Sequence, residues 1–177
     1  MSPSARGTLD WRPAAEHPEL LAPAVAAAID AVPEALVAPI DASLADTAAF
    51  CEAYDVALSA SANCVIVAGR RGDDVRTAAV MVLATHRADV NGVVRRMLDA
   101  RKASFAPMDD AVRDTGMAFG GITPIGLPDW PILVDDAVAD AGEVVIGAGI
   151  RAAKLLVPAA ALLRLPRAER LLLANPA

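Results

Sequence analysis

The residues best suited to chemistry form a loop rich in glycine and proline, with the sequence GGITPIG from Gly120 to Gly126. Glycine has no Cβ, so it permits positive φ and lets a ligand or another backbone segment approach closely. Pro124 fixes its own φ and drives Thr123 toward extended geometry. A stiff loop of this kind offers free backbone amides that can hold a small polar ligand. The same residues could equally form a structural turn between two strands, and composition leaves both interpretations open.

Several well-known catalytic signatures are missing from the sequence. Neither histidine, His17 or His86, has a cysteine or an acid at metal-binding spacing, so no metal site is predicted. There is no G-x-S-x-G elbow and no Walker A loop. GAGIRA, from Gly147 to Ala152, matches the G-x-G-x-x-A pattern of dinucleotide-binding loops. However, Pro158 would stop the helix that this motif requires, so no nucleotide cofactor is expected.

The loop and its surroundings resemble those of the YbaK-type aminoacyl-tRNA deacylases, the stand-alone relatives of the editing domain of bacterial prolyl-tRNA synthetases. The likeness rests on TGMAFGGITPIG, with RKASFA upstream and ILVD downstream, and extends over about residues 46–163. The most specific motif is G-x-x-x-P, here Gly120 to Pro124. The resemblance implies cleavage of the ester between a mischarged amino acid and the terminal adenosine of tRNA. It implies no cofactor, because the attacking group in the family is thought to be a ribose hydroxyl or a water.

The resemblance also implies roles for particular residues. In the family, the backbone of the G-x-x-x-P loop holds the aminoacyl group. Catalytic roles are therefore expected for Gly120, Gly121, Ile122 and Thr123. Substrate-binding roles are expected for Pro124 in the loop and for Gly147, Gly149 and Arg151 in the glycine turn that lies beside it in the family.

The lysine that the family carries near the start of its first long strand falls on Asn63. Asparagine can hydrogen-bond a carbonyl or a hydroxyl, but it has no charge to stabilise an oxyanion or a phosphate. Losing a charge-assisted contact costs about 1.5–3 kcal/mol, or roughly one to two decades in rate. Two interpretations follow. Asn63 could be a catalytic residue of a trans-acting deacylase that clears a small wrong amino acid. Alternatively, the chain could be a non-catalytic binder of an aminoacyl-tRNA end or an aminoacyl adenylate.

Three further polar side chains each have two interpretations. Asp135 could bind the α-ammonium of the substrate, or it could cap the short helix that follows. Thr123 could offer its hydroxyl to the substrate or tie the turn. Lys102 could reach the substrate-binding pocket, or it could face solvent or a phosphate, since it lies on a different strand from Asn63.

Bulk composition indicates one well-buried domain. The chain has 177 residues, of which 55% are hydrophobic and 3% aromatic, so the core must be aliphatic and base-stacking side chains are scarce. No apolar run is long enough to cross a bilayer, and the N-terminus does not show a signal-peptide pattern. Cys51 and Cys64 are expected to be reduced and buried. These features predict a cytoplasmic protein with no membrane partner.

Charge is distributed unevenly along the chain. The formal net charge is −6, which does not suggest a general nucleic-acid binder. Residues 70–113, however, contain nine Lys/Arg and six Asp/Glu, so this stretch carries +3 and the rest of the chain −9. A local basic face fits contact with the aminoacylated acceptor end of a tRNA, and it also fits a solvated surface. An aminoacyl-tRNA synthetase is a second candidate partner under the family resemblance.

Hydrophobic patterning predicts hairpins mixed with short helices. The run 63–68, a Gly/Asp turn at 70–74 and the run 75–85 predict a hairpin. The remaining expected elements are helices at 17–32, 47–54, 90–100, 109–115 and 158–163, and strands at 34–40, 101–106, 131–134, 143–146 and 153–157.

This order of elements predicts an α+β fold. We expect a single domain with a mixed, mostly antiparallel central sheet or partial barrel, flanked by short helices. Residues 1–45 are expected to form an accessory helix and strand that pack on the core. Residues 46–177 are expected to form the editing-type domain. The tail 166–177 is expected to lie on the surface or to fray.

Overall fold

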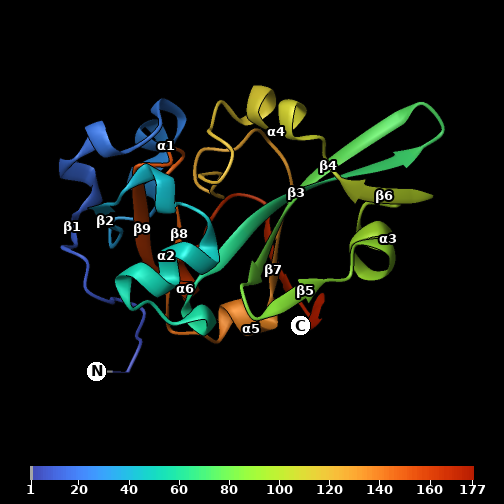
Figure 1. The fold of residues 1–177 in the computed structure, drawn as a ribbon. Helices are drawn as coiled ribbons and strands as arrows, with labels where there is room; N and C mark the ends of the chain where they lie inside the picture. The colour runs from blue at the N-terminus through green and yellow to red at the C-terminus, as the bar shows by residue number, and fades with distance from the viewer. Residues whose placement is uncertain (1) are drawn as a thin grey trace.

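Residues 2–177 are described by the computed structural model shown in Figure 1. The helices are α1 (Pro23–Ala28), α2 (Thr47–Tyr54), α3 (Arg95–Met97), α4 (Met108–Thr115), α5 (Asp136–Ala139) and α6 (Ala159–Leu162). The strands are β1 (Arg12–Pro13), β2 (Leu36–Pro39), β3 (Ala62–Arg71), β4 (Asp74–Leu83), β5 (His86–Ala88), β6 (Lys102–Phe105), β7 (Ile132–Asp135), β8 (Glu143–Gly147), β9 (Ala153–Pro158), β10 (Ala168–Leu171) and β11 (Ala174–Pro176).

Two sheets form the body of the domain. The larger sheet has the strand order β10-β7-β4-β3-β6, and the smaller one has the order β1-β2-β9-β8. β7 pairs in parallel with both β4 and β10, whereas the other pairings within these two sheets are antiparallel. The predicted α+β class with a mixed, mostly antiparallel sheet is confirmed, and the strands within residues 2–177 do not close into a barrel.

The long β3–β4 hairpin spans the molecule, as Figure 1 shows. It runs from the pair Ala62 and Leu83 to the pair Arg71 and Asp74. Gly72 has a φ of +61° in the connecting turn, a conformation that glycine adopts without strain. The hairpin predicted from two apolar runs and a Gly/Asp turn is present, and it supplies the central strand of the larger sheet, β4, and the neighbouring strand β3.

Three apolar layers hold the sheets in place. The main core lies between the two sheets and includes Ile66 and Met81 from one and Ile146 and Leu155 from the other. The opposite face of the larger sheet is covered by the π-helical turn Val90–Val94, by α3 and by the C-terminal tail. α2 covers the outer face of the smaller sheet through Phe50. Because the sheets meet near the start of β3, the strand ends there enclose space that side chains do not fill.

The tail 166–177 departs from the sequence prediction. It contains β10, which extends the larger sheet beside β7, and β11, which pairs with β5. The alternative of a frayed tail was wrong, because the strand partners of these residues lie far away in sequence. The alternative of a tail on the surface agrees with the structure, since most residues of 166–177 are exposed. The tail is fixed by pairing rather than by local propensity.

The expected helix at 17–32 is also shorter than predicted. α1 covers Pro23–Ala28 and is flanked by 3₁₀ turns at Pro18–Leu20 and Ile29–Ala31. Pro23 stands at the first position of α1, where its missing N–H costs no hydrogen bond, so the proline restarts the helix instead of kinking it.

No helix within residues 2–177 is long and apolar enough to cross a membrane.

Candidate functional site

A hollow of about 250 Å³ lies where the two sheets meet. Its walls come from the start of α2, the start of β3, the loop before Thr123, and the facing ends of β8 and β9. Asn63, Gly120, Ile122, Gly147 and Lys154 contribute to the lining. We call this space the catalytic hollow, after the role proposed for it below. It brings Asn63 and the glycine loop together.

Lys154 is a buried cation in this hollow. Its side chain projects from β9 and is 8% exposed. Nζ donates a hydrogen bond to the carbonyl oxygen of Ala45 at 3.0 Å and lies 5.2 Å from the centroid of the Phe50 ring. An ammonium has three N–H donors, and Ala45 uses one of them. The remaining donors are available to a ligand in the hollow.

Burial is the main influence on the Lys154 ammonium. Removal from water lowers the pKa of Lys154 below its ordinary value, and the charge of Arg151 lowers it further. Cys51 and Asp46 act in the opposite direction. A cation with so little solvation interacts strongly with any negative charge that develops beside it.

Asn63 is held in place by Thr47. The Thr47 hydroxyl donates to Oδ1 of Asn63 at 2.8 Å. With its oxygen engaged, Asn63 presents its NH₂ group, which can donate to a carbonyl or a hydroxyl in the hollow. The first residue of α2 therefore sets the orientation of the side chain that stands at the family's lysine position.

The glycine loop is fixed by close backbone packing. Gly149 N donates to Gly121 O at 2.7 Å, and Gly121 N donates to Ala118 O at 2.9 Å. Gly120 has a φ of +85°, which a residue with a Cβ would adopt only with strain. Within residues 2–177, no hydrogen bond is formed by the amides of Gly120 and Ile122. Two lining residues of the hollow thus carry free N–H donors on a rigid loop.

Arg151 braces the loop from outside the hollow. Its Nη1 donates to the carbonyl oxygen of Phe119 at 3.0 Å, and its Nη2 lies 3.6 Å from Oδ1 of Asp46. The guanidinium therefore joins the loop to the start of α2. Arg151 and Gly149, both expected to bind substrate, act on the loop in this structure and do not line the hollow.

The cysteines near the hollow are poor nucleophiles. Cys64 lines the hollow, and burial raises the pKa of its thiol to about 12. Burial also raises the pKa of Cys51. The thiolate is the reactive form of cysteine, so neither residue is ready to attack at neutral pH. Among residues 2–177, no group of three or more His, Cys, Asp or Glu side chains is arranged to hold a metal ion.

Thr123 and Pro124 lie behind the catalytic hollow. Thr123 is fully buried, and its hydroxyl finds no hydrogen-bond partner in the part of the chain that the structure describes. Pro124 lines a different hollow, of about 470 Å³, on the other side of the loop. The expected catalytic role of Thr123 and the expected substrate contact of Pro124 are therefore not supported by their positions.

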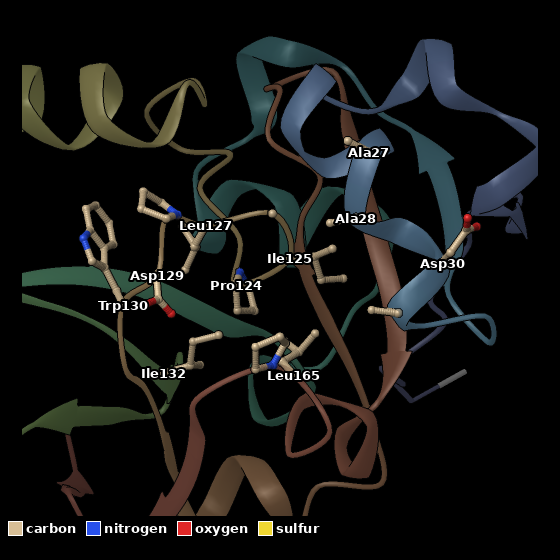
Figure 2. Close-up of a pocket in the computed structure, with 14 residues that line it drawn as sticks. Ala27, Ala28, Asp30, Pro124, Ile125, Leu127, Asp129, Trp130, Ile132 and Leu165 are labelled. Carbon is tan, nitrogen blue, oxygen red and sulfur yellow. The ribbon is translucent and has the colours of Figure 1, made fainter.

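That second hollow, whose lining residues are drawn in Figure 2, is larger but chemically poorer than the first. Apolar side chains such as Ile125, Leu127 and Trp130 form most of its lining. Among residues 2–177, the charged residues that line it are Asp30 and Asp129, and no cation does. An ester carbonyl would find no buried positive charge there, and the indole N–H of Trp130 is an uncharged donor. The smaller hollow is therefore the better candidate for chemistry.

Asp135 and Lys102 lie away from the catalytic hollow. The Asp135 carboxylate is buried and accepts hydrogen bonds from the amides of Ala137, Leu173 and Ala174. This geometry supports the capping interpretation of Asp135 and leaves no oxygen facing a substrate. Lys102 lies on β6 opposite Arg70, in the β3–β6 strand pairing at the far end of β3. It therefore does not replace the missing lysine at Asn63.

Sequence reasoning missed Lys154. The segment from Gly147 to Ala152 joins β8 to β9 as a tight turn without the helix of a dinucleotide-binding motif, as the argument from Pro158 anticipated. The glycine motif drew the prediction to this turn, and Lys154, the one charged residue in the apolar strand that follows, was not considered. A lysine inside a fully buried strand is unusual and could have served as a signal.

Replacing Gly147 by alanine is expected to displace the glycine loop. A Cβ at this position would press against the backbone carbonyls of Gly121 and Ile122. Because backbone atoms cannot swing aside, the loop must move, and we expect hydrolysis by the protein to fall by at least about tenfold. Gly69→Ala is the matched control, since its Cβ would meet Ala100 and Leu98 at the other end of β3. Equal losses of activity in both variants would contradict this role for Gly147.

Comparison with known proteins identifies relatives at both the family and the fold level. A family model described as the aminoacyl-tRNA editing domain matches residues 41–165. No curated protein sequence matches the chain.

Three solved structures share the fold. One, described as a candidate trans-editing enzyme for prolyl-tRNA synthetase, has a TM-score of 0.74 and 20% identity, over 87% of this chain and 96% of that chain. A scaffold from a computational epitope-grafting study has a TM-score of 0.73 and 20% identity, over 88% and 99%. A hypothetical protein has a TM-score of 0.67 and 20% identity, over 77% and 86%.

Proposed function

The chain belongs to the aminoacyl-tRNA editing domain family, and from this premise we propose that it hydrolyses the ester of a mischarged aminoacyl-tRNA as a free-standing protein. The observation that carries the proposal is the position of Lys154, a buried cation in the same hollow as the free amides of Gly120 and Ile122. Positive charge and fixed N–H donors in a small, partly dry space are the requirements for stabilising an oxyanion.

The reaction needs little acid–base equipment, because an aminoacyl ester is already activated. Water adds to the ester carbonyl, and the carbonyl oxygen gains negative charge as the tetrahedral intermediate forms. If a ribose hydroxyl adds first, the acyl group moves to that oxygen, and water then hydrolyses the new ester in the same way. Lys154 and the amides of Gly120 and Ile122 stabilise that charge. Collapse of the intermediate breaks the bond to the ribose oxygen, which takes a proton, and the free amino acid leaves with its carboxylate.

Asn63 orients the substrate in this scheme. Its NH₂ group, directed by the bond from Thr47, donates to the ribose or to the ester oxygen. Lys154 supplies the charge that Asn63 lacks, from β9 of the smaller sheet instead of from β3. The family's pattern of a cation beside the loop is thereby preserved with a different residue.

The size of the catalytic hollow supports a small aminoacyl group. At about 250 Å³, it is below the range of roughly 300–1,000 Å³ that is usual for drug-sized ligands. The partner in this proposal is the aminoacylated acceptor end of tRNA, with an aminoacyl-tRNA synthetase as the source of mischarged substrate. A cytoplasmic location follows from that substrate.

The test is a deacylation screen with purified protein and tRNAs mischarged with alanine, serine, glycine, cysteine and larger amino acids. Release faster than the buffer control is expected for at least one small amino acid. The Gly147→Ala variant should lose that release. If no mischarged tRNA in the screen is hydrolysed above the control, the proposal fails.

A second candidate is a non-catalytic binder of the same aminoacyl end, and the uncharged Asn63 favours it. The variant Asn63→Lys separates the two. If the native protein is an enzyme that relies on Lys154, a second cation in the same hollow is expected to change the rate by less than about tenfold. If the native protein is inactive and Asn63→Lys creates turnover, the binder is the correct assignment. Thr47→Val, which releases the Asn63 oxygen, is a control for disturbed packing at this position.

A further inference from the structure

Positive charge without a carboxylate partner gathers at one end of the larger sheet. Of the fourteen arginines, all of which lie within the described residues, nine have a carboxylate within 4.0 Å. The five that do not are Arg70, Arg87, Arg95, Arg96 and Arg101. On an acidic protein, arginines could be expected to pair with the abundant carboxylates. These five lie in one stretch of the chain. Arg95 donates from Nε and Nη1 to the carbonyl oxygens of Asn91 and Ala100, and the guanidinium groups of the other four form no hydrogen bond within residues 2–177, so they remain available to an external anion.

Three of these arginines and one lysine converge on a single hollow. Arg70, Arg95, Arg101 and Lys102 line a hollow of about 440 Å³ where β6 pairs with the end of β3. No acidic residue lines it within the part of the chain that the structure describes. Three of the four, Arg70, Arg101 and Lys102, are exposed. We call these four residues the basic cluster. Its charge fits the phosphates of a nucleic acid.

An exposed aromatic ring lies between the basic cluster and the catalytic hollow. Phe105 ends β6 opposite Val67 and is 61% exposed. Phe119 lines the catalytic hollow and is 51% exposed. The chain has three phenylalanines. Two of them, Phe105 and Phe119, are therefore exposed to solvent, and both lie on the path from the basic cluster to the catalytic hollow. Exposed rings offer faces on which bases stack.

β3 connects the two hollows directly. Asn63 stands at one end of the strand, Phe105 pairs beside its middle, and Arg70 stands near the other end, as the β3–β6 pairing shows (Figure 1). Seven residues at about 3.3 Å each place Arg70 about 23 Å from Asn63. A single strand of nucleic acid entering the catalytic hollow therefore passes Phe105 before its backbone reaches the basic cluster.

We propose that Phe105 and the basic cluster bind the unpaired 3′ end and the adjoining backbone phosphates of a tRNA acceptor arm. The inference rests on the proposed function, since it places the terminal adenosine at the catalytic hollow. Phe105 stacks on a base of the single strand, and the basic cluster holds the phosphates behind it. Lys102, which lies far from the ester, thereby gains a role in RNA binding.

The experiment measures binding of a fluorescent RNA hairpin with an unpaired CCA end as a function of salt. The triple variant Arg70→Gln, Arg101→Gln, Lys102→Gln should bind at least about tenfold more weakly at low salt. The slope of log K against log salt should fall by about 2, since each lost phosphate contact contributes about 0.7 for a single strand. Phe105→Ala should weaken binding by about tenfold. The matched control for the triple variant is Arg12→Gln, Arg113→Gln, Arg164→Gln, which removes the same charge from ion-paired sites. The matched control for Phe105→Ala is Leu172→Ala, at another exposed apolar residue.

The outcomes separate this inference from the proposed function. The inference is overturned if the native protein does not bind the hairpin, if the two triple variants weaken binding equally, or if a blunt hairpin binds as tightly as the CCA hairpin. Hydrolysis of an aminoacyl-adenosine ester should be unchanged in the basic-cluster variant, because that substrate has no phosphates. If this variant loses RNA binding while the native protein hydrolyses no ester, the binding surface stands and the deacylase proposal falls.

Discussion

Replacing Lys154 by methionine is expected to slow ester hydrolysis by at least about a hundredfold, the usual cost of removing one group that stabilises an oxyanion. Methionine fills a similar volume and suits a buried position, so the fold should persist. Lys154→Arg keeps the charge and should retain part of the activity. The measurement is the first-order rate on an aminoacyl-adenosine ester. Lys102→Met is the matched control, and it should leave that rate unchanged, because Lys102 lies on β6 away from the hollow.

The pH profile gives an independent test of the same residue. Burial lowers the pKa of Lys154 from the ordinary lysine value of 10.5. Activity that needs the ammonium is lost as pH rises through this lowered pKa. After the buffer rate is subtracted, the midpoint of the alkaline loss of activity should therefore lie below pH 10.5. The Lys154→Met variant should lack this limb. A limb that persists unchanged in the variant would contradict a catalytic role for Lys154.

Lys154 affects stability and activity in opposite directions as pH rises. Between the lowered pKa of Lys154 and 10.5, the unfolded chain binds a proton that the folded chain does not. The free energy of unfolding from this group therefore rises with pH in that window. Lys154→Met removes this pH-dependent contribution. The free energy of unfolding of the variant, minus that of the native protein, should therefore be larger at neutral pH than at pH 10.5.

The features that sequence could predict are those encoded by adjacent residues. Two apolar runs around Gly72 specify the β3–β4 hairpin, because the turn and the strands are contiguous. The helix predicted at 109–115 is present as α4, and Gly116, with a φ of +68°, ends it. The glycine loop was located by residue type, since only glycine suits the conformation at Gly120. Local chemistry was sufficient in each of these cases.

The features that sequence could not predict depend on how distant strands pair. Lys154 and Asn63 meet because β8, the edge strand beside β9 in the smaller sheet, lies against the start of β3. No pattern in either strand specifies this juxtaposition. Thr123 illustrates the converse, since its residue type and loop position suggested catalysis, yet packing on both sides of the loop buries it completely. Spatial neighbours, more than residue type, decide the composition of the site.

Replacing Asp135 by alanine is expected to destabilise the protein by about 3–5 kcal/mol, since buried amides would be left without acceptors. Its Oδ1 accepts from Leu173 N at 3.0 Å and Ala174 N at 2.9 Å, and its Oδ2 accepts from Ala137 N at 3.1 Å. The carboxylate is 1% exposed, so water cannot substitute for it. For a chain of this size, the expected fall in Tm is about 10 °C. Thermal unfolding measures it directly.

A graded series distinguishes this structural role from substrate binding. Asp135→Asn keeps one acceptor oxygen for the two tail amides, so it should lose about half as much stability as Asp135→Ala. Asp136→Asn is the matched control, because its ion pair with Arg170 is on the surface and should be worth less than about 1 kcal/mol. Hydrogen exchange at Leu173 should accelerate in the Asp135 variants, since Oδ1 holds the tail that carries β11. If Asp135→Asn instead raised KM on the small ester with no change in Tm, Asp135 would be a substrate ligand. The tail would then be held by its strand pairing with β5 and β7 alone.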